Sequence, residues 1–347
     1  MPNPSFLGTA LPLIQAPMAG VQGHALAAAV CNAGGLGSIP AAMLSLDALR
    51  TELTQLTALT DRPYNVNFFC HTPPAPDAAG DAIWQQALQP FYEELGLSLA
   101  DIVPGPGRAP FSDQVADVVE TFKPSVVSFH FGLPSPQLLA RVKSWGSCVL
   151  GNATTVDEAL WLQAQGADAI IAQGLEAGGH RGIFLSDDLS NQVGTMALLP
   201  QIVQAVSVPV IAAGGIADAR GVAAALALGA SAVQIGTAYM CCPEATTSAL
   251  HRAVLQSPAA RHTALTTLFT GRPARGIMNR LMRELGPLSP AAPAFPLATS
   301  AIAPLRNRAE SRGSTDFSPL WSGQNASHCS SAPAAEVTCA LAEGLLR

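Results

Sequence analysis

The sequence predicts a TIM-type (β/α)8 barrel, and three observations lead to this fold class. Up to about residue 255, eight short apolar segments recur along the chain, and a stretch with helical spacing follows each of them. The segments are nearly continuous hydrophobic runs, as expected for parallel strands that helices cover. Glycines and amide side chains stand directly after several segments, where the loops of a barrel bind ligands. A doubly wound sheet is the alternative, but the first turn lacks a G-x-G-x-x-G run with a downstream acidic residue.

The composition limits the class of protein. Hydrophobic residues make up 49% of the 347 residues and charged residues only 12%, so the chain can bury a large core. A net charge of −6 argues against nucleic-acid binding, which requires a basic face. No run of about 18 apolar residues indicates a membrane span, and the first residues lack the regions of a secretory signal. Seven scattered cysteines without a CxxC pair indicate reduced thiols and no zinc site, so we expect a cytoplasmic protein without membrane contact.

The expected barrel elements follow one another in a regular order. Leu49, Leu53 and Leu56 share one face of the second expected helix. Thr155 is placed to cap a later helix, with the acidic Asp157 in its first turn. The strands are expected at 11–17, 34–39, 64–69, 125–131, 147–151, 169–172, 208–213 and 232–235. The helices are expected at 24–32, 45–60, 135–143, 155–165, 195–205, 218–228 and 245–255.

Two regions depart from this rhythm. Residues 71–124 are predicted to form an insertion after the third strand, with helices at 81–95 and 111–122 and a Pro-Gly loop at 103–107. Residues 256–347 are predicted to form a C-terminal extension of helices and loops that packs on the barrel, 1–255, and on the mouth of the active site. The extension should hold a basic glycine loop at 270–276, helices at 277–285 and 334–346, a Pro- and Ala-rich segment at 287–304 and an aromatic turn at 317–324. This organisation fits a monomer or a homodimer.

One stretch, AIIAQGLEAGGHRG at 169–182, indicates chemistry most strongly. A buried strand runs directly into a glycine-rich loop. Gly178 and Gly179 let the backbone approach a ligand closely, and bare N–H groups in such a loop bind anions. His180 exchanges a proton near neutral pH, so it is the candidate catalytic residue. For Arg181 we expect a surface ion pair, with a phosphate or Glu176 as the alternative partners.

The loops after the last two expected strands predict a phosphate site, because barrels frequently bind phosphate there. Gly214 and Gly215 follow the seventh strand, and Gly236 and Thr237 follow the eighth. Each loop leads toward a helix N-terminus, whose partial positive charge favours a phosphate. Two neighbouring loops of this kind make the phosphate interpretation stronger than either glycine pair alone.

Polar side chains at other strand ends predict a ligand with a ring system. Amides donate and accept hydrogen bonds along the edge of such a ring, although each one alone also fits a satisfied core amide. Together with the phosphate site they predict a phosphorylated, ring-bearing cofactor, above all FMN. The candidates are Gln15 and Met18 from the first unit, Asn67 from the third, Gln173 from the sixth and Gln234 from the eighth.

Several motifs stand out along the chain: QAPMAG (15–20), NVNFF (65–69), VSFHFGLP (127–134), AQGLEAGGHRG (172–182), AAGGIAD (212–218), QIGTAY (234–239) and FSPLWSGQ (317–324). They resemble the nitronate monooxygenases, formerly called 2-nitropropane dioxygenases, and SFHFGLP and LWSGQ are similar to the class I branch. The resemblance covers nearly the whole chain. It implies non-covalent FMN and the oxidation of alkyl nitronates, such as propionate 3-nitronate, by O₂ to a carbonyl compound and nitrite. It implies that FMN is held by Asn67, Gln173, Gly178, Gly215, Gln234, Ile235, Gly236 and Thr237 and that His180 is catalytic.

Two histidines have distinct expected roles. A neutral His180 would take the α-proton of a nitroalkane as general base, and a protonated His180 would attract a preformed nitronate. His130, at the end of the fourth strand, would hydrogen-bond to the nitro group, or it is a packed histidine without a catalytic role. The chain departs from the family pattern at Phe295, where relatives often carry Tyr.

Two other functions remain as alternatives. An FMN-dependent NAD(P)H:quinone or enoyl-thioester reductase uses the same barrel, so the fold alone does not decide. The class I pattern and the lack of an evident dinucleotide fingerprint favour the monooxygenase. A flavin-binding sensor is the third class, and a histidine within a flavin site argues against it.

Overall fold

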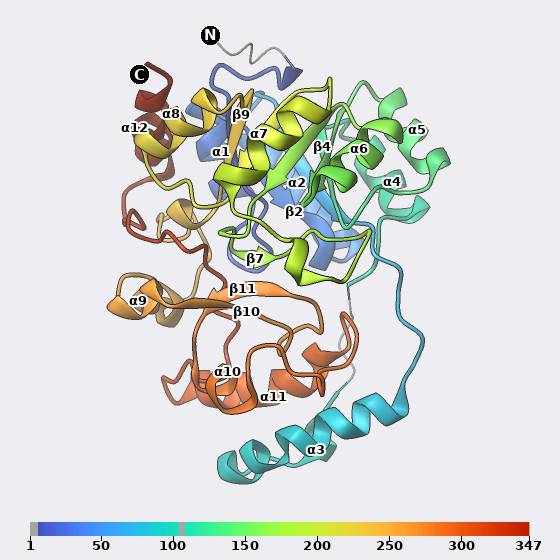
Figure 1. The fold of residues 1–347 in the computed structure, drawn as a ribbon, viewed down its shortest axis with the longest axis vertical. Helices are drawn as coiled ribbons and strands as arrows, with labels where there is room; N and C mark the ends of the chain where they lie inside the picture. The colour runs from blue at the N-terminus through green and yellow to red at the C-terminus, as the bar shows by residue number, and fades with distance from the viewer. Residues whose placement is uncertain (1–5, 104–107, 347) are drawn as a thin grey trace.

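The structure is a computed structural model that describes residues 6–103 and 108–346 (Figure 1). Its parallel strands are β1 (Leu13–Gln15), β2 (Gly37–Pro40), β3 (Tyr64–Phe69), β4 (Val126–His130), β5 (Cys148–Ala153), β6 (Ala169–Gln173), β8 (Val210–Ala213) and β9 (Ala232–Ile235). These eight strands form one sheet in the order β1-β9-β8-β6-β5-β4-β3-β2. Leu36 closes the ring, because its N–H donates to the Leu13 carbonyl at 2.8 Å and its carbonyl accepts from the Gln15 N–H at 2.9 Å. The predicted TIM barrel is confirmed.

The helices around the barrel begin and end within two residues of the predicted bounds. Side-chain caps explain several of the starts, because Ser45, Ser135 and Thr155 each accept a hydrogen bond from the backbone N–H three residues later. These helices are α1 (His24–Asn32), α2 (Leu46–Leu59), α4 (Asp113–Glu120), α5 (Pro136–Ser144), α6 (Val156–Ala164), α7 (Thr195–Ala205) and α8 (Ala219–Ala227).

The eighth position of the helical ring is filled by the end of the chain. The helix expected at 245–255 is shorter, α9 (Ala249–Leu255), and lies beside the lower part of the molecule in Figure 1. The last helix, α12 (Ala334–Ala342), packs between α8 and α1 instead. Its Thr338 Oγ1 lies 3.0 Å from the Tyr239 hydroxyl in the core. Arg252 donates to the carbonyls of Cys242 and Ala245. These bonds stabilise a non-helical turn before α9.

A second, smaller sheet lies below the barrel in Figure 1. It is antiparallel, in the order β10-β11-β7, and consists of β10 (Thr263–Thr266), β11 (Ala274–Ile277) and β7 (Gly179–His180). The predicted loop at 270–276 and helix at 277–285 were therefore wrong in part, because β11 occupies their junction and α10 spans only Arg280–Leu285. The strand forms because β10 and β7 supply its hydrogen-bond partners, and neither partner is visible in the local sequence.

The insertion and the extension share a hydrophobic cluster. Helix α3 (Ala78–Leu95) packs against α11 (Ala298–Ser311), at the bottom of Figure 1. Trp84 Nε1 donates to the Ala298 carbonyl at 3.3 Å, and the Tyr92 hydroxyl donates to the Ala301 carbonyl at 2.6 Å. The predicted boundary between 1–255 and 256–347 stays a prediction. Most of the loop predicted at 103–107 lies outside the described residues.

Within residues 6–103 and 108–346, no helix is both long and apolar enough to cross a membrane. The same residues contain no group of His, Cys, Asp and Glu side chains that is placed to hold a metal ion. All seven cysteines are free thiols.

Candidate active site

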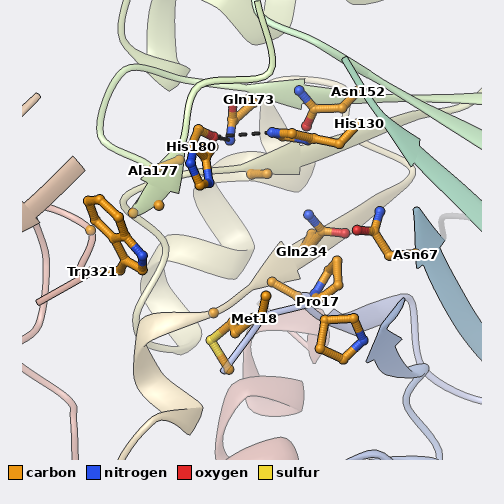
Figure 2. Close-up of a pocket in the computed structure, with 18 of the residues that line it drawn as sticks. Pro17, Met18, Asn67, His130, Asn152, Gln173, Ala177, His180, Gln234 and Trp321 are labelled. Carbon is orange, nitrogen blue, oxygen red and sulfur yellow. Dashed lines mark hydrogen bonds between the residues drawn. The ribbon is translucent and has the colours of Figure 1, made fainter. Parts of the chain in front are cut away.

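A cavity opens at the carboxyl ends of the barrel strands (Figure 2). Strands from all around the ring contribute to its lining, and the tail adds Trp321, Ser322, Gly323 and Asn325. All but two of the predicted site residues line this cavity: Met18, Asn67, His130, Gln173, Gly178, Gly179, His180, Gly214, Gly215, Gln234, Gly236 and Thr237.

Gln15 and Ile235 lie behind the lining. The Gln15 amide is fully buried, donates to Gln22 Oε1 and accepts from the Ser38 N–H at 3.1 Å. The Ile235 side chain packs in the barrel core, and its carbonyl accepts from the Ala16 N–H at 2.8 Å. The structure thus gives these two residues a part in holding the loop around Met18, and it places neither side chain against a ligand.

Two amides of the cavity, those of Gln234 and Asn152, leave hydrogen-bonding groups for a ligand, whereas both ends of the Gln173 amide are bonded to the segment 180–182. Asn67 and Gln234 turn their amide ends toward each other in Figure 2. Gln234 Oε1 and Asn152 Nδ2 are buried and have no hydrogen-bond partner in the described part of the chain. A buried polar atom without a partner costs roughly 1–3 kcal/mol, so these two atoms fit a bound group that offers a donor and an acceptor. Asn152 was not predicted, although it stands at the end of a barrel strand as the other amides do.

A cradle for an anion lies at one end of the cavity. Gly214 and Gly215 have φ values of +118° and +73°, which side chains other than glycine rarely adopt. The backbone N–H groups of Gly178, Gly215 and Thr237 have no hydrogen-bond partner among the described residues. Free N–H groups that converge from several loops form an anion-binding nest. The N-terminus of α8 is not part of it, because the Asp218 carboxylate caps that helix.

The tail closes over this cradle. Its Gly323 N–H donates to Thr237 Oγ1 at 2.9 Å, and the Gln324 N–H donates to the Glu176 carbonyl at 2.9 Å. Asn325 Nδ2 donates to the Gly215 carbonyl at 3.3 Å. One segment of the C-terminal extension therefore bridges the two loops that are predicted to hold a phosphate and the glycine-rich loop before β7.

His180 sits on the short strand β7, opposite Ala274 of β11. Its Nε2 lies 3.0 Å from Thr270 Oγ1. Its carbonyl accepts from Gln173 Nε2 at 3.0 Å and lies 3.2 Å from His130 Nε2. A carbonyl only accepts, so His130 carries its proton on Nε2 and serves to hold the backbone of His180. The two histidines predicted from the sequence thus lie together, in the upper half of Figure 2.

Both histidines are neutral near pH 7. Burial, followed by the positive charge of Arg108, holds the pKa of His180 well below its usual range. Burial, followed by the charge of Arg272, lowers the pKa of His130 to about 3. A neutral imidazole is able to accept a proton. The expected attraction of a nitronate by a protonated His180 is not supported, because the buried site disfavours the charged form.

Arg181 is fully buried, which contradicts the expected surface ion pair. Its guanidinium donates to the carbonyls of Gln173 and Gly174 at 2.7 and 2.6 Å and to Gln192 Oε1 at 3.0 Å. Arg181 is not part of the cavity lining, and it makes no bond to the Glu176 carboxylate, which accepts instead from Thr195. Arg181 therefore fixes the loop between β6 and β7.

Aromatic residues that the sequence did not bring together surround His180. The ring centroids of Phe295 and Trp321 lie 5.4 and 5.7 Å from that of His180. Phe295 thus faces the site without a hydroxyl, and the hydroxyl near His180 comes from Thr270. Trp321 belongs to the aromatic turn that the sequence indicated, whereas nothing in the sequence pointed to Thr270 or to Arg108, which also lines the cavity.

Comparison with known proteins gives a consistent result. The family model described as nitronate monooxygenase matches residues 3–344. The nitronate monooxygenase of Paraburkholderia phytofirmans is 44% identical, with 97% of this chain and 92% of the relative covered. The nitronate monooxygenase of Pseudomonas aeruginosa is 42% identical, with 98% and 97% covered.

Two solved structures are also similar to this chain. The nitroalkane oxidase of Streptomyces ansochromogenes superposes with a TM-score of 0.89 at 39% identity and covers 98% of this chain and 96% of its own. FabK of Thermotoga maritima superposes with a TM-score of 0.74 at 27% identity and covers 99% and 95%.

Proposed function

The chain belongs to the nitronate monooxygenase family, and from this premise we propose that it oxidises alkyl nitronates with O₂ to a carbonyl compound and nitrite. It is an oxidoreductase and a flavin enzyme, and the flavin that we propose is FMN. The observation that carries the proposal is the cavity, in which unpartnered amides, a glycine cradle and a neutral His180 line one space.

The residues present fit FMN. Gln234 Oε1 and Asn152 Nδ2 offer an acceptor and a donor to the edge of a ring system. The free N–H groups of Gly178, Gly215 and Thr237 would hold the phosphate. When bound, FMN accepts electrons from the substrate and passes them on to O₂.

The state of His180 indicates which form of the substrate is used. A base whose pKa is held well below its usual range is neutral and free to accept a proton, but it binds that proton weakly. Transfer of the α-proton from a neutral nitroalkane to His180 is therefore unfavourable. A nitronate has already lost this proton, so its oxidation does not require that step. We propose that preformed nitronates are the better substrates and that His180 acts as base only for the slower reaction of neutral nitroalkanes.

The reductase alternative keeps some support from the similarity to FabK. The family match over residues 3–344 and the higher identity to nitronate monooxygenases favour the oxidation of nitronates. We further propose a cytoplasmic monomer or homodimer in which O₂ reaches the flavin directly. Light scattering on the purified protein tests the oligomeric state.

The deciding experiment starts with the visible spectrum of the purified protein and the identity of the flavin released by heat. Anaerobic mixing with propionate 3-nitronate should bleach the flavin, and aerobic turnover should consume O₂ and release nitrite. Oxidation of NADH with a quinone as acceptor is measured in parallel. Bound FAD would contradict FMN, and rapid NADH turnover without nitrite formation from nitronates would establish the reductase instead.

A further inference from the structure

The cavity lacks negative charge. None of the described residues that line it is Asp or Glu, and its one cationic side chain near pH 7 is Arg108, because both lining histidines are neutral. A nitronate is an anion, and the mouth of a cavity lined in this way favours anionic ligands. The question is which part of a substrate the Arg108 guanidinium meets.

Arg108 has no acidic partner among the described residues. No ion pair to its guanidinium is found in the part of the chain that the structure describes, and burial alone lowers its pKa. Its described hydrogen bond runs from Nη1 to Thr299 Oγ1 at 3.1 Å, and Thr299 in turn donates to the Phe269 carbonyl at 3.1 Å. An arginine carries five N–H donors in a planar fork that matches a carboxylate. Most of this fork is therefore available to a ligand.

Arg272 is the second arginine whose charge lowers the pKa of His180. Arg272 does not line the cavity, and its Nη2 donates to the Ile183 carbonyl. Its guanidinium lies 4.0 Å from the centroid of the Phe131 ring. Arg272 therefore lowers the pKa of His180 from a structural position, whereas Arg108 faces the space where a substrate binds.

Arg108 lies near the reacting centre without touching it. Its Cζ is 5.6 Å from the centroid of Phe295, and the same ring lies 5.4 Å from the ring of His180. No hydrogen bond joins Arg108 and His180 within the described residues. The guanidinium thus meets a group of the substrate other than the carbon whose proton His180 accepts.

On the basis of the proposed function, we propose that Arg108 is a specificity-determining residue that binds a carboxylate carried by the nitronate substrate. The neutral His180 and the flavin site act on the nitronate end, and Arg108 pairs with the second negative charge. Thr299 fixes one edge of the guanidinium and Phe295 supports its face, so the fork is oriented before the substrate arrives. Nitronates with an anionic tail are then preferred over those with a neutral tail.

The test compares three nitronates: propionate 3-nitronate, the nitronate of its methyl ester and butyl 1-nitronate. Arg108→Met should lower kcat/KM for propionate 3-nitronate by about ten- to hundredfold, mainly through KM, which is the usual range for a lost charged hydrogen bond. The ester and the butyl compound should change by less than about threefold. Arg108→Lys should recover part of the loss, because it keeps the charge and loses the planar fork.

Arg62→Met serves as the charge-matched control. Arg62 is exposed and precedes β3, at the opposite end of the barrel from the cavity, so its loss should leave all three nitronates unchanged. Flavin content and circular dichroism are measured for every variant. The affinity for 3-nitropropionate, followed through the flavin spectrum without O₂, should fall for Arg108→Met in step with KM.

The outcomes separate the two proposals. Equal losses on charged and neutral tails would mean that Arg108 supports the site as a whole, and no loss on any substrate would place it outside the site; either result overturns the assignment. A wild-type protein that oxidises none of the three nitronates would refute the proposed function, and the binding of 3-nitropropionate would then still decide whether Arg108 recognises a carboxylate.

Discussion

The close approach of Gly178 to the tail allows the closure of the tail to be tested directly. A Cβ at Gly178 would lie 2.5 Å from the backbone of Ser322 and Gly323, so Gly178→Ala is incompatible with the closed tail. Opening the tail relieves the clash and forfeits the bonds from Gly323 and Gln324. Overpacking typically costs about 1–3 kcal/mol. If that cost falls on the flavin-bound form, the affinity for FMN drops by roughly 5- to 150-fold.

The matched control is Gly146→Ala. Gly146 lies between α5 and β5, outside the lining of the cavity, and has a φ of +84°; a Cβ there would meet no atom within 4 Å. Its substitution therefore strains the backbone by about 1–2 kcal/mol without touching the tail or the cavity. The free energy of unfolding should fall for Gly146→Ala, while its FMN affinity falls much less than that of Gly178→Ala.

The assay measures the Kd for FMN by fluorescence and the hydrogen exchange of the Gly323 and Gln324 amides. Gly178→Ala should weaken FMN binding and speed exchange at both amides, and Gly146→Ala should leave that exchange unchanged. An FMN Kd for Gly178→Ala within twofold of wild type, together with unchanged exchange, would refute the idea that the tail helps to hold the cofactor.

Three further predictions concern the histidines. His180→Asn should slow the oxidation of neutral nitroalkanes by about a hundredfold, the usual contribution of a positioned base, and slow preformed nitronates less; equal losses would show that His180 is not chiefly a base. Thr270→Val should reduce turnover of neutral nitroalkanes by roughly 2- to 12-fold through the lost bond to His180 Nε2, and rates unchanged from wild type would remove Thr270 from the mechanism. The lowered pKa values of His71 and His251, about 4, and of His130, about 3, mean that the unfolded chain binds more protons than the folded one below pH 6.5, as it does for His180. The contribution of these histidines to the free energy of unfolding should therefore be greatest above pH 6.5 and decrease toward pH 4. Urea titrations across this pH range measure it, and a free energy that does not change with pH would show that the histidines are not held neutral by burial.

Local sequence patterns were sufficient for the barrel, because each strand is a short apolar run and each surrounding helix has its own cap and apolar face. Local patterns did not predict elements whose packing partner lies far along the chain. Helix α11 was missed because Pro304 and the Pro- and Ala-rich segment before it suggested a loop, whereas packing against α3 stabilises the helix.

The same distinction applies to the site. Asn67, Gln173, Gln234 and the glycine pairs lie on or directly after strands, so their common position followed from the barrel alone. Arg108 reaches the cavity through the insertion, and Thr270 reaches His180 through the extension; the paths of both segments depend on tertiary packing. Arg181 was misassigned because burial of a guanidinium among backbone carbonyls leaves no pattern in the sequence.

The position of α12 has a consequence for how the protein is made. Strands β1 and β9 pair across more than two hundred residues, and Thr338 reaches Tyr239 only after the last segment is synthesised. A nascent chain on the ribosome therefore exposes the apolar faces of α1 and α8 until α12 has emerged, a situation that invites aggregation or chaperone binding. Because Trp321 and Gly323 emerge just before α12, the last helix and the cover of the cofactor cradle fold at nearly the same time. Flavin capture then awaits the emergence of these two segments, and it coincides with completion of the helical ring.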